Sequence, residues 1–148
     1  MKSTPMSILK AAKGTNPNYT KGIEYQMNCQ RCVHAYELRR RRYVVCTKPI
    51  PASGNSISWG SECFTPPGKN ARGEFTFHLT EKEVKNRIAS SPNGARFVVY
   101  IEWKNQKTTH VFVAERNGGV IRFIAPQDGN ENAAHYFSQG TEGEFGVF

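Results

Sequence analysis

The sequence lacks any apolar run long enough to cross a bilayer, and its first residues lack the apolar core of a signal peptide. It also lacks internal repeats, low-complexity tracts and nucleic-acid-binding motifs. We therefore expect neither a membrane nor a nucleic acid as partner. Acidic residues are few, because 12 Asp and Glu face 20 Lys and Arg, and the formal net charge is +8. This excess favours an acidic protein as the partner.

Cysteines are also few, and their spacing limits what they do. A disulfide framework is not expected in 148 residues without a secretion signal. A zinc site has little support, because only two cysteines have the required spacing and both fall in a helical pattern. A thioredoxin-like pair needs a strand just before it, which residues 24–27 barely suggest. We therefore expect no bound metal and reduced thiols, one of them reactive. The four are Cys29, Cys32, Cys46 and Cys63.

Residues 28–41 have the pattern of a helix that begins at a cysteine. Asn28 is a favourable N-cap residue, because its side-chain oxygen accepts hydrogen bonds from backbone N–H groups one turn later. Cys29 then takes the first helical position, where the helix dipole stabilises a thiolate and makes the sulfur a better nucleophile. Cys32 lies on the apolar face of the same helix and is expected to be a buried thiol.

The rest of the N-terminal half is less regular. Residues 1–22 contain scattered Gly, Pro, Lys and Asn, and we expect a flexible lead-in or linker with a short helix around residues 7–12. One domain is then expected over residues 23–148. A β-branched run at residues 43–46 predicts a strand. Residues 49–73 are rich in Pro, Gly, Ser and Asn and predict a long surface loop.

The C-terminal half predicts one capped helix and an antiparallel sheet. Thr80 and Glu83 have the spacing of a capping box, ahead of a helix that turns apolar residues inward. Alternating apolar residues then predict strands over residues 96–103, 108–115 and 120–125. Asn117-Gly118 predicts a two-residue turn between the last two strands. The fold class expected from these elements is α+β.

A cysteine nucleophile needs a general base, which is most often a histidine. His34 is expected to be exposed on another face of the cysteine helix. His110 differs from the other histidines because it lies within a predicted strand, with Phe112 and Ala114 on its own face. A strand histidine is more often structural than catalytic, so position alone leaves both roles open. The four candidates are His34, His78, His110 and His135.

The predicted turn decides which residue lies opposite His110. With Asn117-Gly118 as the turn, counting back along both strands pairs His110 with position 125. Directly opposed side chains have Cβ atoms about 5 Å apart, so a carboxylate at this position would orient the imidazole. The residue there is Ala125.

Three separated segments carry a resemblance to a known family. They are residues 28–40 (Asn28-Cys29-Gln30-Arg31-Cys32-Val33 through Glu37-Leu38-Arg39-Arg40), Thr109-His110-Val111-Phe112 and Ile124-Ala125-Pro126-Gln127. Here the sequence resembles the papain-fold toxin domains, described as glutamine deamidases of the polymorphic-toxin type in bacterial and phage-borne effectors. The resemblance covers roughly residues 23–137.

The resemblance implies a papain-like α+β fold, in which the N-terminal cysteine helix packs on an antiparallel sheet, and it implies no cofactor. It implies Cys29 as nucleophile, His110 as base and an acidic residue of an Asp-Pro-Gln motif as the group that orients the histidine. This chain departs from that pattern, because Ala125 precedes Pro126 and Gln127. The strand count and the family motif thus indicate the same position.

Two hypotheses account for Ala125. Either it was substituted to disarm a toxin, or Gln127 takes over the orienting role, as an amide does in papain-like proteases. We favour the first, because the rest of the site is retained. The oxyanion would be bound by the Cys29 backbone N–H together with the side-chain amide of Asn28 or Gln26.

The expected function is therefore that of a delivered effector toxin that acts in the cytoplasm of a target cell. It would deamidate a glutamine of a target protein, be inhibited by a cognate immunity protein, and be disarmed or weakened here by Ala125. A papain-like protease, an acyltransferase and a non-catalytic binding module with the same fold remain alternatives. A small zinc-binding domain is a further hypothesis.

Overall fold

The computed structural model describes residues 4–49 and 76–148. These residues form two compact units, which we describe separately. The first unit contains residues 4–49 together with residues 126–130, and the second contains residues 76–125 and 131–148. Apart from residue 49, the predicted loop at 49–73, with Cys63, lies outside the described residues. No helix among the described residues combines the length and apolar character that a bilayer span requires.

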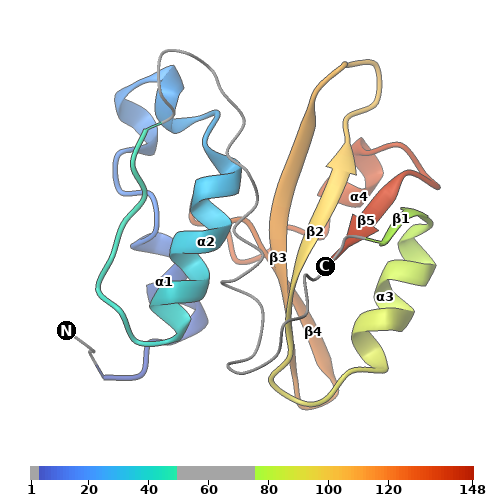
Figure 1. Ribbon diagram of the computed structural model, residues 1–148, viewed down its shortest axis with the longest axis horizontal. Helices are drawn as coiled ribbons and strands as arrows, with labels where there is room; N and C mark the ends of the chain where they lie inside the picture. The colour runs from blue at the N-terminus through green and yellow to red at the C-terminus, as the bar shows by residue number, and fades with distance from the viewer. Residues whose placement is uncertain (1–3, 50–75) are drawn as a thin grey trace, which may run out of the picture. The chain divides into compact units, whose positions relative to one another are not determined.

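The first unit is helical (Figure 1). The predicted helix near residues 7–12 is confirmed as α1, and Ser7 caps it by accepting a hydrogen bond from the Lys10 backbone N–H at 3.2 Å. The stretch predicted as a lead-in also contains buried side chains, including those of Ala11 and Ala12, because one face of α1 is covered. The elements are α1 (Ile8–Lys13), η1 (Tyr19–Lys21), η2 (Ile23–Tyr25) and α2 (Cys29–Arg40).

Arg39 joins the two helices of the first unit. Its guanidinium donates to the carbonyl oxygens of Ala11 at 3.0 Å and Lys10 at 3.2 Å, near the C-terminus of α1. It also donates to the carbonyl of Val45 at 2.8 Å. Only 9% of the residue is exposed, so the Arg39 side chain is a buried link between the C-terminal end of α1, α2 and the segment that follows α2.

The strand predicted at residues 43–46 is wrong, because residues 44–49 are irregular. Val44 is 68% exposed, and the Val45 carbonyl accepts from Arg39 instead of from a neighbouring strand. The backbone N–H of Thr47 donates to the Thr15 carbonyl at 2.8 Å. A β-branched run forms a strand only where a partner strand takes up its backbone groups, and here side chains and a loop take them up.

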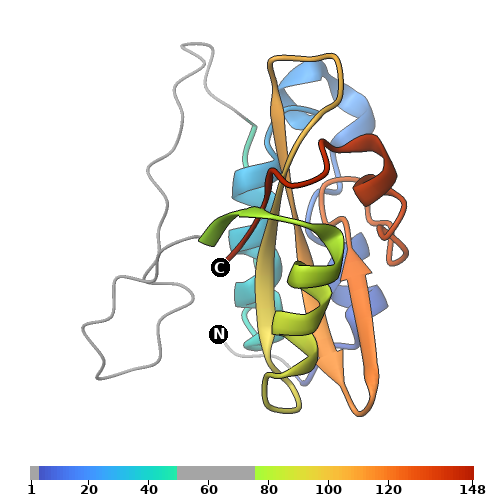
Figure 2. The same cartoon turned by 90° about the vertical axis from the view of Figure 1, so that its right-hand side faces the viewer.

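The second unit is an antiparallel sheet with strand order β1-β5-β2-β3-β4 (Figures 1 and 2). The predicted α+β class is thus confirmed, with the cysteine-bearing helix preceding the sheet in the chain. The strands are β1 (Thr76–Leu79), β2 (Arg96–Glu102), β3 (Thr109–Asn117), β4 (Val120–Ile124) and β5 (Phe145–Val147), and the helices are α3 (Glu81–Ala89) and α4 (Tyr136–Gln139).

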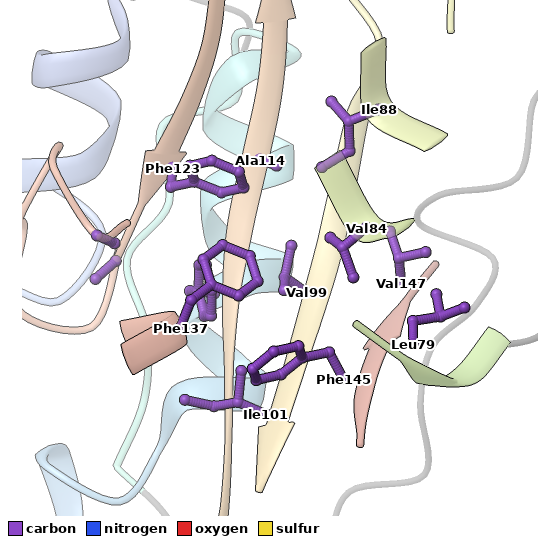
Figure 3. Close-up of a cluster of buried hydrophobic side chains, with 13 residues drawn as sticks. Leu79, Val84, Ile88, Val99, Ile101, Ala114, Phe123, Phe137, Phe145 and Val147 are labelled. Carbon is purple, nitrogen blue, oxygen red and sulfur yellow. The ribbon is translucent and has the colours of Figure 1, made fainter. Parts of the chain in front are cut away.

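One face of this sheet carries the hydrophobic core of the second unit. Val84 and Ile88 of α3 are fully buried against it, as the sequence predicted. Figure 3 shows side chains of α3, α4 and the strands meeting over the sheet, among them Phe137 and Val99. His110 and Phe112 of β3 pair with Ile101 and Val99 of β2, so the candidate base lies on the core face of the sheet.

The β3–β4 turn differs from the predicted one by a shift of two residues in register. Asn117 pairs with Val120, so the turn residues are Gly118-Gly119 and not Asn117-Gly118. Gly118 has φ 61°, a left-handed conformation that costs glycine little. Continuing the observed register places Ala125 beside Phe112 and not directly opposite His110. Because the shift is even, Ala125 keeps its place on the face that carries His110.

The predicted capping box of α3 is confirmed and gives a stability prediction. Thr80 Oγ1 accepts from the Glu83 backbone N–H at 3.1 Å, and Glu83 Oε2 accepts from the Thr80 N–H at 2.7 Å. We expect Thr80→Ala to lower the free energy of unfolding by about 1 kcal/mol, because a helix N–H loses its partner. Urea unfolding measures this loss, with Thr80→Ser as the control that keeps the hydroxyl. Equal midpoints for Thr80→Ala and the parent chain would contradict the assignment.

Candidate active site

Cys29 is the first residue of α2, and its side chain is partly buried. Asn28 is the N-cap residue, but the predicted side-chain cap is wrong, since its side chain makes no hydrogen bond to the helix N–H groups. Instead, Asn28 Oδ1 accepts from Cys32 Sγ at 3.3 Å and from Asn16 Nδ2 at 3.3 Å. Because Asn28 is only 2% exposed, the residue before the cysteine is fixed by buried amide contacts.

Cys32 is fully buried, as predicted. Its Sγ lies 3.3 Å from Asn28 Oδ1 and 3.6 Å from Thr47 Oγ1. Burial raises the pKa of the Cys32 thiol to about 12, because a thiolate would lose its hydration there. Cys32 is therefore a neutral thiol at neutral pH and a poor nucleophile.

Asn16 lies at the centre of the polar contacts that precede α2. Its Nδ2 donates to the carbonyl oxygens of Tyr25 at 2.8 Å and Gln127 at 2.9 Å, as well as to Asn28 Oδ1. The residue is 6% exposed. Sequence reasoning missed it, because a single asparagine in a segment rich in Gly and Pro carries no pattern that marks it as buried.

Gln127 belongs to the first unit and lies at the same place. Its Nε2 donates to the Gln26 carbonyl at 2.7 Å and is 3.5 Å from Asn28 Oδ1. The structure therefore brings together Gln127, Gln26 and Asn28 at the start of the cysteine helix. In this arrangement the Gln127 amide N–H groups already have acceptors within the first unit.

The two side chains expected at the oxyanion also have carbonyl partners. Asn28 Nδ2 donates to the Lys48 carbonyl at 3.2 Å, and Gln26 Nε2 donates to the Tyr19 carbonyl at 3.3 Å. Gln26 is exposed, whereas Asn28 is buried. The first N–H groups of α2, by contrast, have no carbonyl one turn earlier within the helix. The oxyanion role of Asn28 and Gln26 stays a prediction.

His110 lies in an aromatic environment within the second unit. Its ring stacks on Trp103 with centroids 5.3 Å apart and meets the edge of Tyr136 at 5.0 Å. Only 7% of the residue is exposed. Burial lowers the pKa of His110 from 6.5 to about 4, because the imidazolium loses hydration among these rings. The imidazole is therefore neutral at neutral pH, which is the form that accepts a proton.

The hydrogen bonding of the His110 ring is incomplete within the described part of the chain. Nε2 is buried and has no hydrogen-bond partner among the residues that the structure describes. Ala125, on the same face of the sheet, is 1% exposed and offers only a methyl group. A buried polar group left without a partner costs about 1–3 kcal/mol. Among its described residues, the second unit thus combines a buried imidazole nitrogen without a partner with an apolar residue at the position where the sequence predicts a carboxylate.

The other histidines have different surroundings. His34 is partly buried, so the expectation that it is exposed is wrong; its position on α2 turns it towards packed residues. His78 Nδ1 lies 2.8 Å from Glu144 Oε2 in an exposed hydrogen-bond contact. His135 Nδ1 lies 3.1 Å from the Asn132 carbonyl. Within residues 4–49 and 76–148, no three His, Cys, Asp or Glu side chains are grouped so that they would hold a metal ion.

Comparison with known proteins identifies the family. A search of curated proteins found no match. The family model described as papain fold toxin 1, glutamine deamidase, matches residues 27–130. The matched region begins just before Cys29 and contains His110, Ala125 and Gln127. Because the match covers more than half of the chain, this protein belongs to the papain fold toxin 1 family of glutamine deamidases.

Proposed function

We propose that this chain is an effector toxin domain that deamidates glutamine side chains of a target protein, with Cys29 as nucleophile. The observation that carries the proposal is the position of Cys29, a partly buried thiol at the first residue of α2 inside the family match. The nearby Cys32 is unsuited to this role, because its buried thiol has a pKa of about 12. A helix start also stabilises the thiolate that attacks.

The proposed reaction has two stages. Cys29 Sγ attacks the carboxamide carbon of the substrate glutamine, and His110 takes the thiol proton. The C–N bond then breaks, His110 returns the proton to the leaving nitrogen, and ammonia departs from a thioester. Water attacks the thioester carbon and gives a proton to His110, the C–S bond breaks, and His110 returns the proton to Cys29 Sγ. The products are a glutamate side chain and the restored Cys29 thiol.

His110 is neutral at neutral pH, the form in which it can accept a proton, although the burial that lowers its pKa to about 4 also makes it a weaker base. At position 125, where the family motif has its acidic residue, this chain has Ala125. The buried Nε2, which has no partner in residues 4–49 and 76–148, and the methyl group of Ala125 support a weakened or disarmed enzyme. The proposal that Gln127 orients His110 instead has less support, since its Nε2 donates to the Gln26 carbonyl. We therefore propose that Ala125 limits the activity of this chain.

A non-catalytic binding module that keeps the fold is the second candidate, and Ala125 is the observation that favours it. Proteolysis or acyl transfer would use the same thioester chemistry. Deamidation is preferred because the family is described by that activity.

The first unit also suggests the kind of partner. Its described residues contain nine Lys and Arg against three Asp and Glu, whereas those of the second unit contain eight against seven. We propose that an acidic surface, on the target protein or on a cognate immunity protein, binds the first unit. The target would be met in the cytoplasm of the cell that receives the effector.

Incubation with a panel of lysate proteins tests the proposed reaction. We expect ammonia release together with glutamine-to-glutamate conversion, detected by peptide mass spectrometry. Cys29→Ser should remove both signals, whereas Cys46→Ser should keep them, because Cys46 is an exposed thiol outside α2. Equal signals above background from the parent chain and Cys29→Ser would exclude the cysteine mechanism. Cleaved peptides without deamidation would favour the protease.

A further inference from the structure

We propose that Asn16 is a positioning residue for Cys29, which holds the start of α2 through Asn28 and Gln127. The inference deepens the proposed function and rests on it, since it assumes that Cys29 reacts. Asn16 lies outside the family match, which begins at residue 27.

The first argument is the geometry of the Asn16 amide. Its Nδ2 contacts three acceptors from two separate segments: the Tyr25 carbonyl and Asn28 Oδ1 before α2, and the Gln127 carbonyl. Tyr25 and Gln127 are the two close acceptors, at 2.8 and 2.9 Å. One NH₂ group therefore joins the loop that leads into Cys29 to Gln127, which lies 111 residues beyond Asn16 in the chain.

The second argument is that the contacts of Asn16 lead to the residue next to the nucleophile. Asn28 directly precedes Cys29, and its Oδ1 also accepts from Cys32 Sγ and lies near Gln127 Nε2. If the Asn16 donor were removed, Asn28 would lose one of these buried contacts and the Tyr25 and Gln127 carbonyls would lose theirs. Small displacements of a reacting group cost large factors in rate.

The third argument is that Asn16 is itself held firmly. The preceding Thr15 donates from Oγ1 to the Ala11 carbonyl at 2.8 Å, at the end of α1. The Thr15 carbonyl accepts from both the N–H and the Oγ1 of Thr47. Thr15 is fully buried. These contacts fix Thr15 against α1 and Thr47, and thereby fix the backbone position of Asn16. The proposal therefore makes the N-terminal segment necessary for the position of Cys29.

Asn16→Ala removes the donor, and Asn16→Asp removes it while keeping the size of the side chain. Asn18→Ala is the matched control, because Asn18 lies two residues away and its side chain makes no cap hydrogen bond. The readout is the rate of alkylation by iodoacetamide, resolved by peptide mass spectrometry. Cys46, an exposed thiol of the same unit, serves as the internal reference.

We expect both Asn16 variants to lower the ratio of the Cys29 alkylation rate to the Cys46 alkylation rate by about tenfold. Asn18→Ala should leave this ratio unchanged. All rates are measured well below the melting temperature of each variant. Where deamidation is measurable, kcat should fall with KM within twofold. If either Asn16 variant folds and keeps the parent's ratio of Cys29 to Cys46 alkylation rates, the proposal is overturned. If Asn16→Ala does not fold, the test is made with Asn16→Asp. Alkylation of Cys29 does not require catalysis, so this rate tests the role of Asn16 alone. The proposed function is tested by the activity of Cys29→Ser, and deamidation by that variant would refute it.

Discussion

Ala125→Asp is expected to raise the deamidation rate by on the order of 10⁴-fold, the scale on which catalytic triads depend on their orienting carboxylate. The reason lies in the second unit. His110 Nε2 is buried without a partner among the described residues, and Ala125 lies on the same face of the sheet, one pair further along. Residues placed diagonally across two strands are within reach of longer side chains such as histidine. A carboxylate at position 125 would accept from Nε2 and leave the other ring nitrogen to take the thiol proton.

Three further variants make this result interpretable. Ala125→Asn supplies an acceptor without charge and should restore part of the rate, whereas Ala125→Leu supplies bulk alone and should restore none. Ala125→Asp combined with Cys29→Ala should be inactive. Growth of bacteria that express each chain gives a second readout, and only Ala125→Asp and, to a lesser degree, Ala125→Asn should slow it. If soluble Ala125→Asp behaves like the parent in both assays, the binding module becomes the better interpretation.

Stability is expected to fall by about 3 kcal/mol between pH 6.5 and pH 4 through His110 alone. The pKa of His110 is lowered by burial from 6.5 to about 4. Below pH 6.5 the unfolded chain therefore binds a proton that the folded chain does not, and the free energy of unfolding decreases. The loss is complete once the pH falls below the folded value near 4.

Urea unfolding at a series of pH values measures this effect, and His110→Phe is the comparison. Phenylalanine keeps an aromatic ring beside Trp103 and Tyr136 but does not titrate. Between pH 6.5 and pH 4, the free energy of unfolding of the parent chain should fall by about 3 kcal/mol more than that of His110→Phe. Ala125→Asp should reduce the loss, because a nearby carboxylate favours the imidazolium and raises the pKa of His110. Parallel curves for the parent chain and His110→Phe would contradict the assignment.

The sequence correctly predicted the elements that are determined by residues close together in the chain. The helix that begins at Cys29, the capping box at Thr80 and the inward face of α3 follow from spacing over one or two turns, and each is confirmed. The antiparallel sheet followed from alternation and from a glycine-containing turn. Resemblance over three segments identified the family, which the match over residues 27–130 confirms.

The sequence-based predictions are wrong where the local structure depends on residues far away in the chain, or where two adjacent pairs of residues could both form a turn. Asn117-Gly118 is the stronger turn signal, yet the chain turns at Gly118-Gly119, and the pairing of His110 moves by two residues. In the run at residues 43–46, the Val45 carbonyl accepts from Arg39 and not from a neighbouring strand. Asn28 was expected to cap its own helix, but its oxygen binds Asn16 and Cys32.

The location of residues 126–130 has a consequence for how this protein can be divided. β4 belongs to the second unit, whereas the five residues that follow Ala125 belong to the first, and the chain then returns to the second unit. Neither unit is a continuous piece of sequence. A gene fragment ending before residue 126 would encode the cysteine helix without Gln127, whose carbonyl and amide bind Asn16 and Gln26. Recombination can therefore exchange this domain only whole, since no single crossover point within it separates one unit from the other.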